Sequence, residues 1–268
     1  MNNVLELFER LTNIKANKYR LIKEGITNIN YLIHSCNGVF VMRIPRSNMI
    51  GIDYVNQGKI LKLVKELNVE VIYYDDSTGI MITKYLENIT KEKVPFDVVV
   101  KHLKKLHSIS CANLSDFDPF KLIDIYKAIV NDTLFKNEEK VIFKAKEIYN
   151  KYPKVLSHND VLYANFISAN NTYYLIDYEY AGGNIALFDI ASFLSENNID
   201  DISLQLQFIN KYFDTVNDEL LDDINLMFMF LDILWGYWAK AMYIKYQEEI
   251  FEIIFNEKLN RYKTKICN

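Results

Sequence analysis

The sequence is poor in cysteine, and the cysteines that it has are scattered. There are 3, at Cys36, Cys111 and Cys267, an odd number without the spacing of a metal-binding motif or a disulfide framework. We therefore expect reduced thiols in a cytoplasmic protein. The N-terminal residues MNNVLELFERL carry acidic side chains and no apolar signal core, which argues against export.

Glycine, proline and long apolar runs are also scarce. With 8 Gly, 4 Pro, 50% hydrophobic and 25% charged residues, the composition is that of an ordered globular protein and excludes a disordered one. The longest apolar stretch, residues 226–239, is interrupted by Asp232 and is too short to span a bilayer, so we expect a buried helix and no membrane insertion. A net charge of -4 and the lack of a basic stripe argue against a nucleic-acid partner.

The pattern along the chain predicts an α+β protein with two lobes. Residues 31–44, YLIHSCNGVFVMRI, read as a hairpin through the turn signal Asn37-Gly38. Residues 54–67 have helical periodicity, and residues 69–75 and 79–85 are short strand candidates. From about residue 90 the pattern is mostly helical, over 97–108, 120–150, 189–196 and from 200 onward. We expect a small antiparallel-sheet lobe over 1–83, a crossover over 84–90 and a larger helical lobe over 91–268, with a ligand cleft between the lobes.

The stretch LSHNDVLYANFISANNTYYLIDYEYAGG, residues 156–183, carries the most chemical information. Two strand-like runs flank a turn composition at residues 169–171, which predicts a hairpin that pairs Asn165 with Ile176. Asn165 and Asp177 then converge at the open end of the hairpin, with Asp160 just upstream. Three oxygen-bearing side chains at one place suit Mg²⁺ and phosphate oxygens.

This layout matches the template of phosphoryl transfer. In that template an aspartate accepts the proton of the substrate hydroxyl, an asparagine five residues later holds Mg²⁺, and a second aspartate follows a short hairpin. Asp160 is then the general base, and Asn165 and Asp177 are the metal ligands. The structural alternative is that Asp160 caps a turn and Asp177 ends a strand, but His158 and the apolar strands on both sides favour the kinase interpretation.

Three segments, HNDVLYANFI, YLIDYEYAG and FDIASFLSEN, resemble the choline/ethanolamine kinases. Within the aminoglycoside-phosphotransferase-like kinases, the sequence is most similar to the bacterial choline kinases. The resemblance implies a bilobal protein-kinase-like fold, ATP and Mg²⁺, and transfer of the γ-phosphate to a small alcohol. It also implies that His158 and Asp189 support the catalytic loop, although Asp189 is equally a helix N-cap candidate.

The resemblance implies a set of ATP-binding residues in the first lobe: Gly25, Thr27, Asn28, Arg43, Tyr85 and Leu86. The first three belong to a phosphate-covering turn, Arg43 is a strand-borne cation for the phosphates, and the last two lie in the crossover that contacts adenine. The family's usual helix glutamate, which pairs with the cation, is missing. Either Asp53 supplies the carboxylate, or Gln57 takes the glutamate's place and the cation is held differently, and the sequence leaves both open.

Trp235 and Trp238, in LWGYWAK, are the only two tryptophans and lie three residues apart, on one face of a helix. By composition alone this pair is more economically explained as hydrophobic core. The segment is similar to the Trp-x-x-Trp helix of choline kinases, where aromatic faces hold a quaternary ammonium by cation–π attraction. The resemblance implies Glu196 as the acidic residue facing the ammonium and Tyr180 as a further wall.

We therefore expect an ATP-dependent choline kinase that makes phosphocholine. Ethanolamine, an aminoglycoside or another small alcohol is the alternative substrate in the same fold. A catalytically silent kinase-like binding protein is less favoured, because Asp160, Asn165 and Asp177 are all present.

Overall fold

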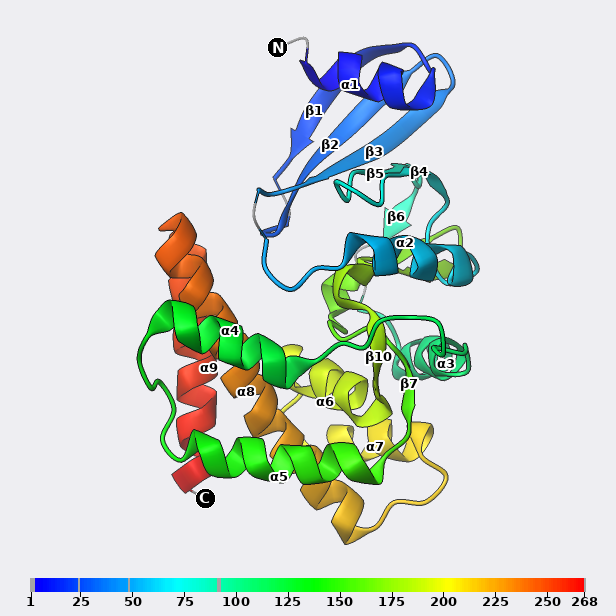
Figure 1. Cartoon of the computed structure of the whole chain (residues 1–268). Helices are drawn as coiled ribbons and strands as arrows, with labels where there is room; N and C mark the ends of the chain where they lie inside the picture. Colours follow the sequence, from blue (N-terminus) through cyan, green and yellow to red (C-terminus); the bar gives the residue numbers. More distant parts are fainter. Residues whose placement is uncertain (1–2, 24, 48, 91–92, 268) are drawn as a thin grey trace. The chain divides into compact units, whose positions relative to one another are not determined.

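The computed structural model describes residues 3–23, 25–47, 49–90 and 93–267. The chain forms two compact units, and Figure 1 labels the helices and strands that make up each of them. The first unit comprises residues 1–102 and 163–182, and the second comprises residues 103–162 and 183–268. The hairpin predicted in the middle of the chain therefore belongs to the same unit as the N-terminal sheet. The expected functional boundaries at 83 and 90 stay a prediction.

A five-stranded antiparallel sheet organises the first unit, with strand order β1-β2-β3-β5-β4. The strands and the two helices of this part are α1 (Asn3–Thr12), β1 (Ala16–Ile22), β2 (Asn28–Ser35), β3 (Gly38–Pro45), α2 (Tyr54–Leu63), β4 (Val71–Tyr74) and β5 (Met81–Lys84). Consecutive strands pair, except that β5 lies between β3 and β4. This is the antiparallel lobe that the hydrophobic pattern predicted.

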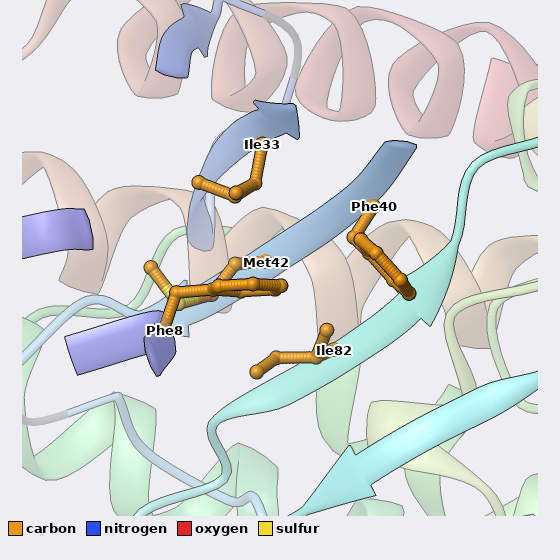
Figure 2. Packing of buried hydrophobic residues seen from close by; sticks show 5 residues of the cluster. All are labelled: Phe8, Ile33, Phe40, Met42 and Ile82. Carbon is orange, nitrogen blue, oxygen red and sulfur yellow. The ribbon is translucent and has the colours of Figure 1, made fainter. Parts of the chain in front are cut away.

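Helix α1 is held against this sheet by one buried cluster (Figure 2). Phe8 of α1 is fully buried and packs among Ile33 of β2, Phe40 and Met42 of β3 and Ile82 of β5. Phe40 and Met42 are two residues apart on their strand, so they point to the same face of the sheet. Arg43, the next residue of β3, points to the other face of the sheet, away from this cluster.

The hairpin of β2 and β3 confirms the predicted strands but moves the turn by one residue. Ser35 pairs with Gly38, so Cys36 and Asn37 form the two-residue connection. Gly38 has φ +119°, a region that favours glycine, and it opens the second strand instead of ending the turn.

The predicted central hairpin is confirmed in its register. Strand β8 (Phe166–Ala169) pairs with β9 (Thr172–Leu175), Ser168 lies opposite Tyr173, and β6 (Ile89–Thr90) adds a third strand. The Ile176 N–H donates to the Asn165 carbonyl at 2.8 Å, so the pairing continues to the open end as expected. Two short 3-10 turns, η1 (Tyr163–Asn165) and η2 (Tyr178–Tyr180), flank this hairpin.

The second unit is mostly helical. Its elements are the end of α3 (Phe96–His107), α4 (Pro119–Val130), α5 (Glu138–Lys151), β7 (Lys154–Ser157), β10 (Gly182–Ile185), α6 (Ala186–Glu196), α7 (Ile202–Tyr212), α8 (Asp218–Tyr246) and α9 (Glu249–Cys267). Helix α8 is central, since α4, α5, α6 and α9 all pack against it. In the described part of the chain, no helix has the length and apolar character needed to cross a membrane.

The predicted helical stretch over 120–150 was wrong in one respect, because it is two helices. Asn131 ends α4 in the left-handed conformation, φ 53°, and its N–H donates to the Lys127 carbonyl at 2.8 Å. Asn137 precedes α5 with φ 60°. Asparagine tolerates this conformation better than most residues, so the two asparagines allow the chain to turn between the helices.

We predict that Phe8→Ala destabilises the protein by about 3–5 kcal/mol, because it removes a buried ring from the cluster of Figure 2. Urea unfolding measures the change. Phe143 is the matched control, since its side chain is 64% exposed and Phe143→Ala should change stability by no more than about 0.5 kcal/mol. Equal effects of the two variants would contradict the packing of α1 on the sheet.

Candidate active site

Arg43 is a buried cation of the first unit, and carboxylates surround it. Its side chain comes from β3 and ion-pairs with the carboxylate of Asp177. The Arg43 Nη1 atom also lies 4.0 Å from Glu179 Oε2. One cation between two carboxylates leaves a formal charge of −1, which favours the approach of a further cation.

Burial and charge together set the ionisation of this group. Burial lowers the pKa of Arg43, but the carboxylates of Asp177 and Glu179 outweigh it and raise the pKa above its ordinary value, so Arg43 is a permanent cation. Burial, and then the charge of Asp177, raise the pKa of Glu179 to about 7, although Arg43 and Asn28 oppose that change.

The partner of Arg43 is therefore neither Gln57 nor Asp53, and the cation is held differently, by Asp177 and Glu179. Gln57 is buried on α2 and accepts a hydrogen bond from the Tyr74 hydroxyl at 2.9 Å. Asp53 is the N-cap of α2 and accepts from the Asn56 N–H at 2.9 Å. The acidic residue that sequence reasoning missed is Glu179. In the sequence, Glu179 could have been noticed as a carboxylate between two tyrosines, two residues after the predicted metal ligand Asp177.

The predicted phosphate-covering turn joins β1 to β2 and is tied to the same site. Asn28 Nδ2 donates to Glu179 Oε2 at 2.8 Å, and also to Thr27 Oγ1 at 2.9 Å. Gly25 has φ +102°, and a Cβ there would come within 2.9 Å of the Asn30 side chain. The turn thus requires glycine at this position. The side chains of Thr27 and Asn28, which follow it, are buried.

The predicted crossover residues line a cleft within the first unit. Tyr85 and Leu86 border a cavity of about 1250 Å³, together with Val39 and Phe40 of β3 and Tyr74 of β4. The Tyr85 N–H donates to the Val39 carbonyl at 3.0 Å. That amide therefore extends the sheet pairing, and adenine contact by Tyr85 and Leu86 stays a prediction.

The donors of the expected magnesium site are compatible with that ion. The hairpin brings Asn165 and Asp177 to one open end, and both offer hard oxygen atoms. Among the described residues, no group of three or more His, Cys, Asp or Glu side chains is arranged to hold a metal. Because Mg²⁺ is usually bound by one or two carboxylates together with substrate phosphates, so sparse a set of protein ligands fits it.

In the second unit, Asp189 organises the segment that contains Asp160. The Asp189 carboxylate accepts the His158 N–H at 2.8 Å and the Asn159 N–H at 2.7 Å. Asn159 adopts φ 68°, and its side-chain oxygen accepts from Asn184 Nδ2 at 2.7 Å. Asp160 directly follows these two amides and is partly exposed. Asp189 thus binds two backbone amides of this loop, and it is not the N-cap of α6, which is Ile185.

A histidine at the end of α3 also binds Asp189. His107 Nε2 lies 2.9 Å from Asp189 Oδ2, and His107 Nδ1 lies 2.6 Å from the Tyr212 hydroxyl. The buried carboxylate of Asp189 therefore has a partner from helix α3 as well as two from the loop, which satisfies its charge.

The two tryptophans are built into the aromatic interior of the second unit. Trp235 and Trp238 are 7% and 6% exposed, and their rings meet edge to face with centroids 6.1 Å apart. Trp235 approaches Phe117, and Trp238 contacts Phe251 of α9 with centroids 5.7 Å apart. In the described part of the chain, Trp238 Nε1 is buried without a hydrogen-bond partner. Tyr180, the further wall expected, is buried in η2 of the first unit.

Glu196, the predicted acidic contact for the ammonium, already has cationic partners. Lys258 Nζ ion-pairs with Glu196 Oε2, and Arg261 Nη2 lies 2.8 Å from Glu196 Oε1. Both cations come from α9, and sequence reasoning missed them because no motif surrounds them.

A family model for choline/ethanolamine kinase matches residues 20–263. The chain belongs to the choline/ethanolamine kinase family. Protein LicA of Haemophilus influenzae is 26% identical over 243 residues, which cover 81% of this chain and 71% of that protein. As a member of the family, the chain is a phosphotransferase that acts on an alcohol.

Solved structures agree on the fold of this kinase. Choline kinase LicA from Streptococcus pneumoniae matches with a TM-score of 0.80 at 20% identity, over 98% of both chains. An ethanolamine kinase from Plasmodium vivax matches with a TM-score of 0.72 at 18% identity, over 92% of this chain and 84% of that one. The protein-kinase-like fold predicted from the sequence, with a sheet lobe and a mostly helical lobe, is confirmed.

We predict that Glu196 contributes an acid-sensitive component to the kinase's stability. Burial alone raises the pKa of Glu196, but Lys258 and Arg261 outweigh it and lower this pKa to about 2, from an ordinary value of 4.5. Because the folded pKa is the lower one, the stabilisation is present above pH 4.5 and is lost as the pH falls toward 2. Between pH 5 and pH 3 the loss is roughly 2 kcal/mol.

Urea unfolding at pH 5 and pH 3 measures this component as the difference between wild type and Glu196→Gln. The variant should show the smaller change between the two pH values. Glu257→Gln removes an exposed carboxylate from α9 and should behave as wild type. Identical pH dependence in Glu196→Gln and wild type would contradict the ion pairs assigned to Glu196.

Proposed function

We propose that the protein is an ATP-dependent choline kinase that makes phosphocholine, with Asp160 as its general base. Family membership supports the reaction class. The observation that carries the assignment of Asn165 and Asp177 is the hairpin register, in which the Ile176 N–H binds the Asn165 carbonyl and Asp177 follows directly. The tryptophan pair of α8 supports choline as the acceptor.

In the proposed reaction Asp160 accepts the proton of the acceptor hydroxyl. The hydroxyl oxygen then attacks the γ-phosphorus, a new P–O bond forms, and the bond from the γ-phosphorus to the β–γ bridging oxygen breaks. ADP leaves with the electron pair of that bond. The amides that Asp189 binds hold in place the backbone that precedes Asp160.

The proposed nucleotide residues lie in the first unit. Asn165 and Asp177 would hold Mg²⁺, which supplies charge neutralisation to the phosphate oxygens when it is bound. Arg43 supplies a fixed cation to the phosphates, and its pairing with Glu179 orients the guanidinium when Asp177 is engaged by the metal. The turn at Gly25, Thr27 and Asn28 covers the phosphates, and Tyr85 and Leu86 border the adenine.

The proposed acceptor site uses Trp235 and Trp238. A quaternary ammonium has no N–H to donate, so aromatic faces are suitable partners for it. Tyr180, which lies in the first unit, stays a sequence-based candidate for acceptor binding. Ethanolamine is the second candidate substrate, because the family model covers kinases of both alcohols.

The proposed function is tested by ATP consumption with Mg²⁺ against choline, ethanolamine, aminoglycosides and small sugar alcohols. Choline should rank first, and Asp160→Asn should remove its turnover by at least about 10³-fold while leaving the fold unchanged. Asp124→Asn, an exposed aspartate on α4, is the control and should retain activity. Choline at the level of the background would refute the substrate, and turnover retained by Asp160→Asn would refute the base.

The role of the tryptophans is tested by Trp235→Phe, which keeps an aromatic ring in the buried position. We expect the KM for choline to rise roughly tenfold, because indole is the better cation–π partner, and the KM for ATP to change by less than about twofold. Tyr237→Phe is the control, because that hydroxyl binds Glu138 at 2.7 Å and belongs to the structural core. Equal changes in the two KM values would assign Trp235 to the core alone.

A further inference from the structure

A buried cluster of five charged residues joins three helices of the second unit. Glu196 ends α6, Asp232 lies in the middle of α8, and Lys258, Arg261 and Lys265 lie on α9. Arg261 binds both carboxylates, and Lys265 Nζ lies 3.1 Å from Asp232 Oδ2. The side chains of Glu196 and Lys258 are only 10% and 9% exposed.

This charged cluster continues the aromatic cluster along the same two helices. Asp232 precedes Trp235 by three residues, so the two lie on one face of α8. On α9, Lys258 lies between Phe251, which contacts Trp238, and Arg261, which binds Asp232. The proposed ammonium site and the charged cluster are therefore neighbouring parts of one helix–helix interface.

The cluster does not offer negative charge to a substrate. Glu196 Oε2 binds Lys258, and Glu196 Oε1 accepts from Arg261 at 2.8 Å and from the Ser195 hydroxyl at 3.1 Å. Three cations against two carboxylates give the cluster a formal charge of +1. A substrate cation that reached Glu196 would have to displace Lys258 and leave a buried ammonium without its partner, which is costly.

We infer that Lys258 determines substrate specificity by occupying Glu196, so that the pocket holds its cation by aromatic faces and selects a quaternary ammonium over a primary one. The inference rests on the proposed function and changes the role predicted for Glu196. A primary ammonium brings three N–H donors that need acceptors once water is removed. A trimethylammonium group brings none, so it loses nothing when Glu196 is occupied.

Lys258→Met tests this directly, because it removes the cation that binds Glu196 Oε2, leaves Oε1 with Arg261, and keeps a similar side-chain volume. The ratio of kcat/KM for choline to that for ethanolamine should fall by about tenfold or more, through a gain for ethanolamine. Lys258→Arg restores a cation beside Glu196 and should restore the wild-type ratio. Lys265→Met is the matched control on the same helix, since Lys265 binds Asp232, and it should keep the wild-type ratio.

A second variant decides the matter even if Lys258→Met folds poorly. Glu196→Gln/Lys258→Met removes both members of the pair together and leaves no buried charge unpaired between them. Its Kd for choline, measured by calorimetry, should stay within about twofold of wild type. A rise of about tenfold or more would show that Glu196 is the direct counter-ion of choline and would overturn the inference.

The inference is also overturned if Lys258→Met lowers kcat/KM for both alcohols by the same factor, because Lys258 would then be structural only. Failure of the proposed function has a different signature. In that case the wild type phosphorylates neither alcohol, and the ratio of the two Kd values in wild type and Lys258→Met still reports whether Lys258 sets the preference.

Discussion

Charged side chains buried inside each unit need partners, and the functional regions of this protein depend on how that need is met. Arg43 is held between Asp177 and Glu179, Asp189 is held by two loop amides and His107, and Glu196 is held by Lys258 and Arg261. Removing one member of such a group leaves an uncompensated charge, which is far more costly than the loss of an exposed ion pair. Each buried group therefore constrains the backbone around it.

These constraints have different consequences for the kinase. The Arg43 group connects the predicted phosphate-covering turn to the hairpin flanked by Asn165 and Asp177, through the bond from Asn28 to Glu179. The Asp189 group fixes the backbone that precedes Asp160. The Glu196 group joins α9 to the tryptophan-bearing helix and neutralises the carboxylate expected to face the substrate. Under the proposed function, recognition of the acceptor then depends on the aromatic rings.

Much of the fold was predictable from local patterns. The central hairpin was predicted with the correct register because its strands and turn are contiguous, and Ser168 does pair with Tyr173. The turn after β2 was placed one residue late, since Gly38 supplies its positive φ as the first residue of β3. The break between α4 and α5 was missed because it depends on the left-handed backbone of Asn131 and Asn137, which the helical periodicity of the flanking residues does not show.

By itself the sequence predicted the reaction class, because Asp160, Asn165 and Asp177 lie close together along the chain. Their spacing and the pairing of the strands between them could therefore be read from the sequence. The fold class followed from periodicity in the same way. Only the tertiary structure decided which charges are paired. Arg43 lies 134 residues from Asp177, and Glu196 lies 62 residues from Lys258, with no motif to connect them. Such pairs form because packing brings helices and strands together, and the desolvation of each charge then selects its nearest opposite partner.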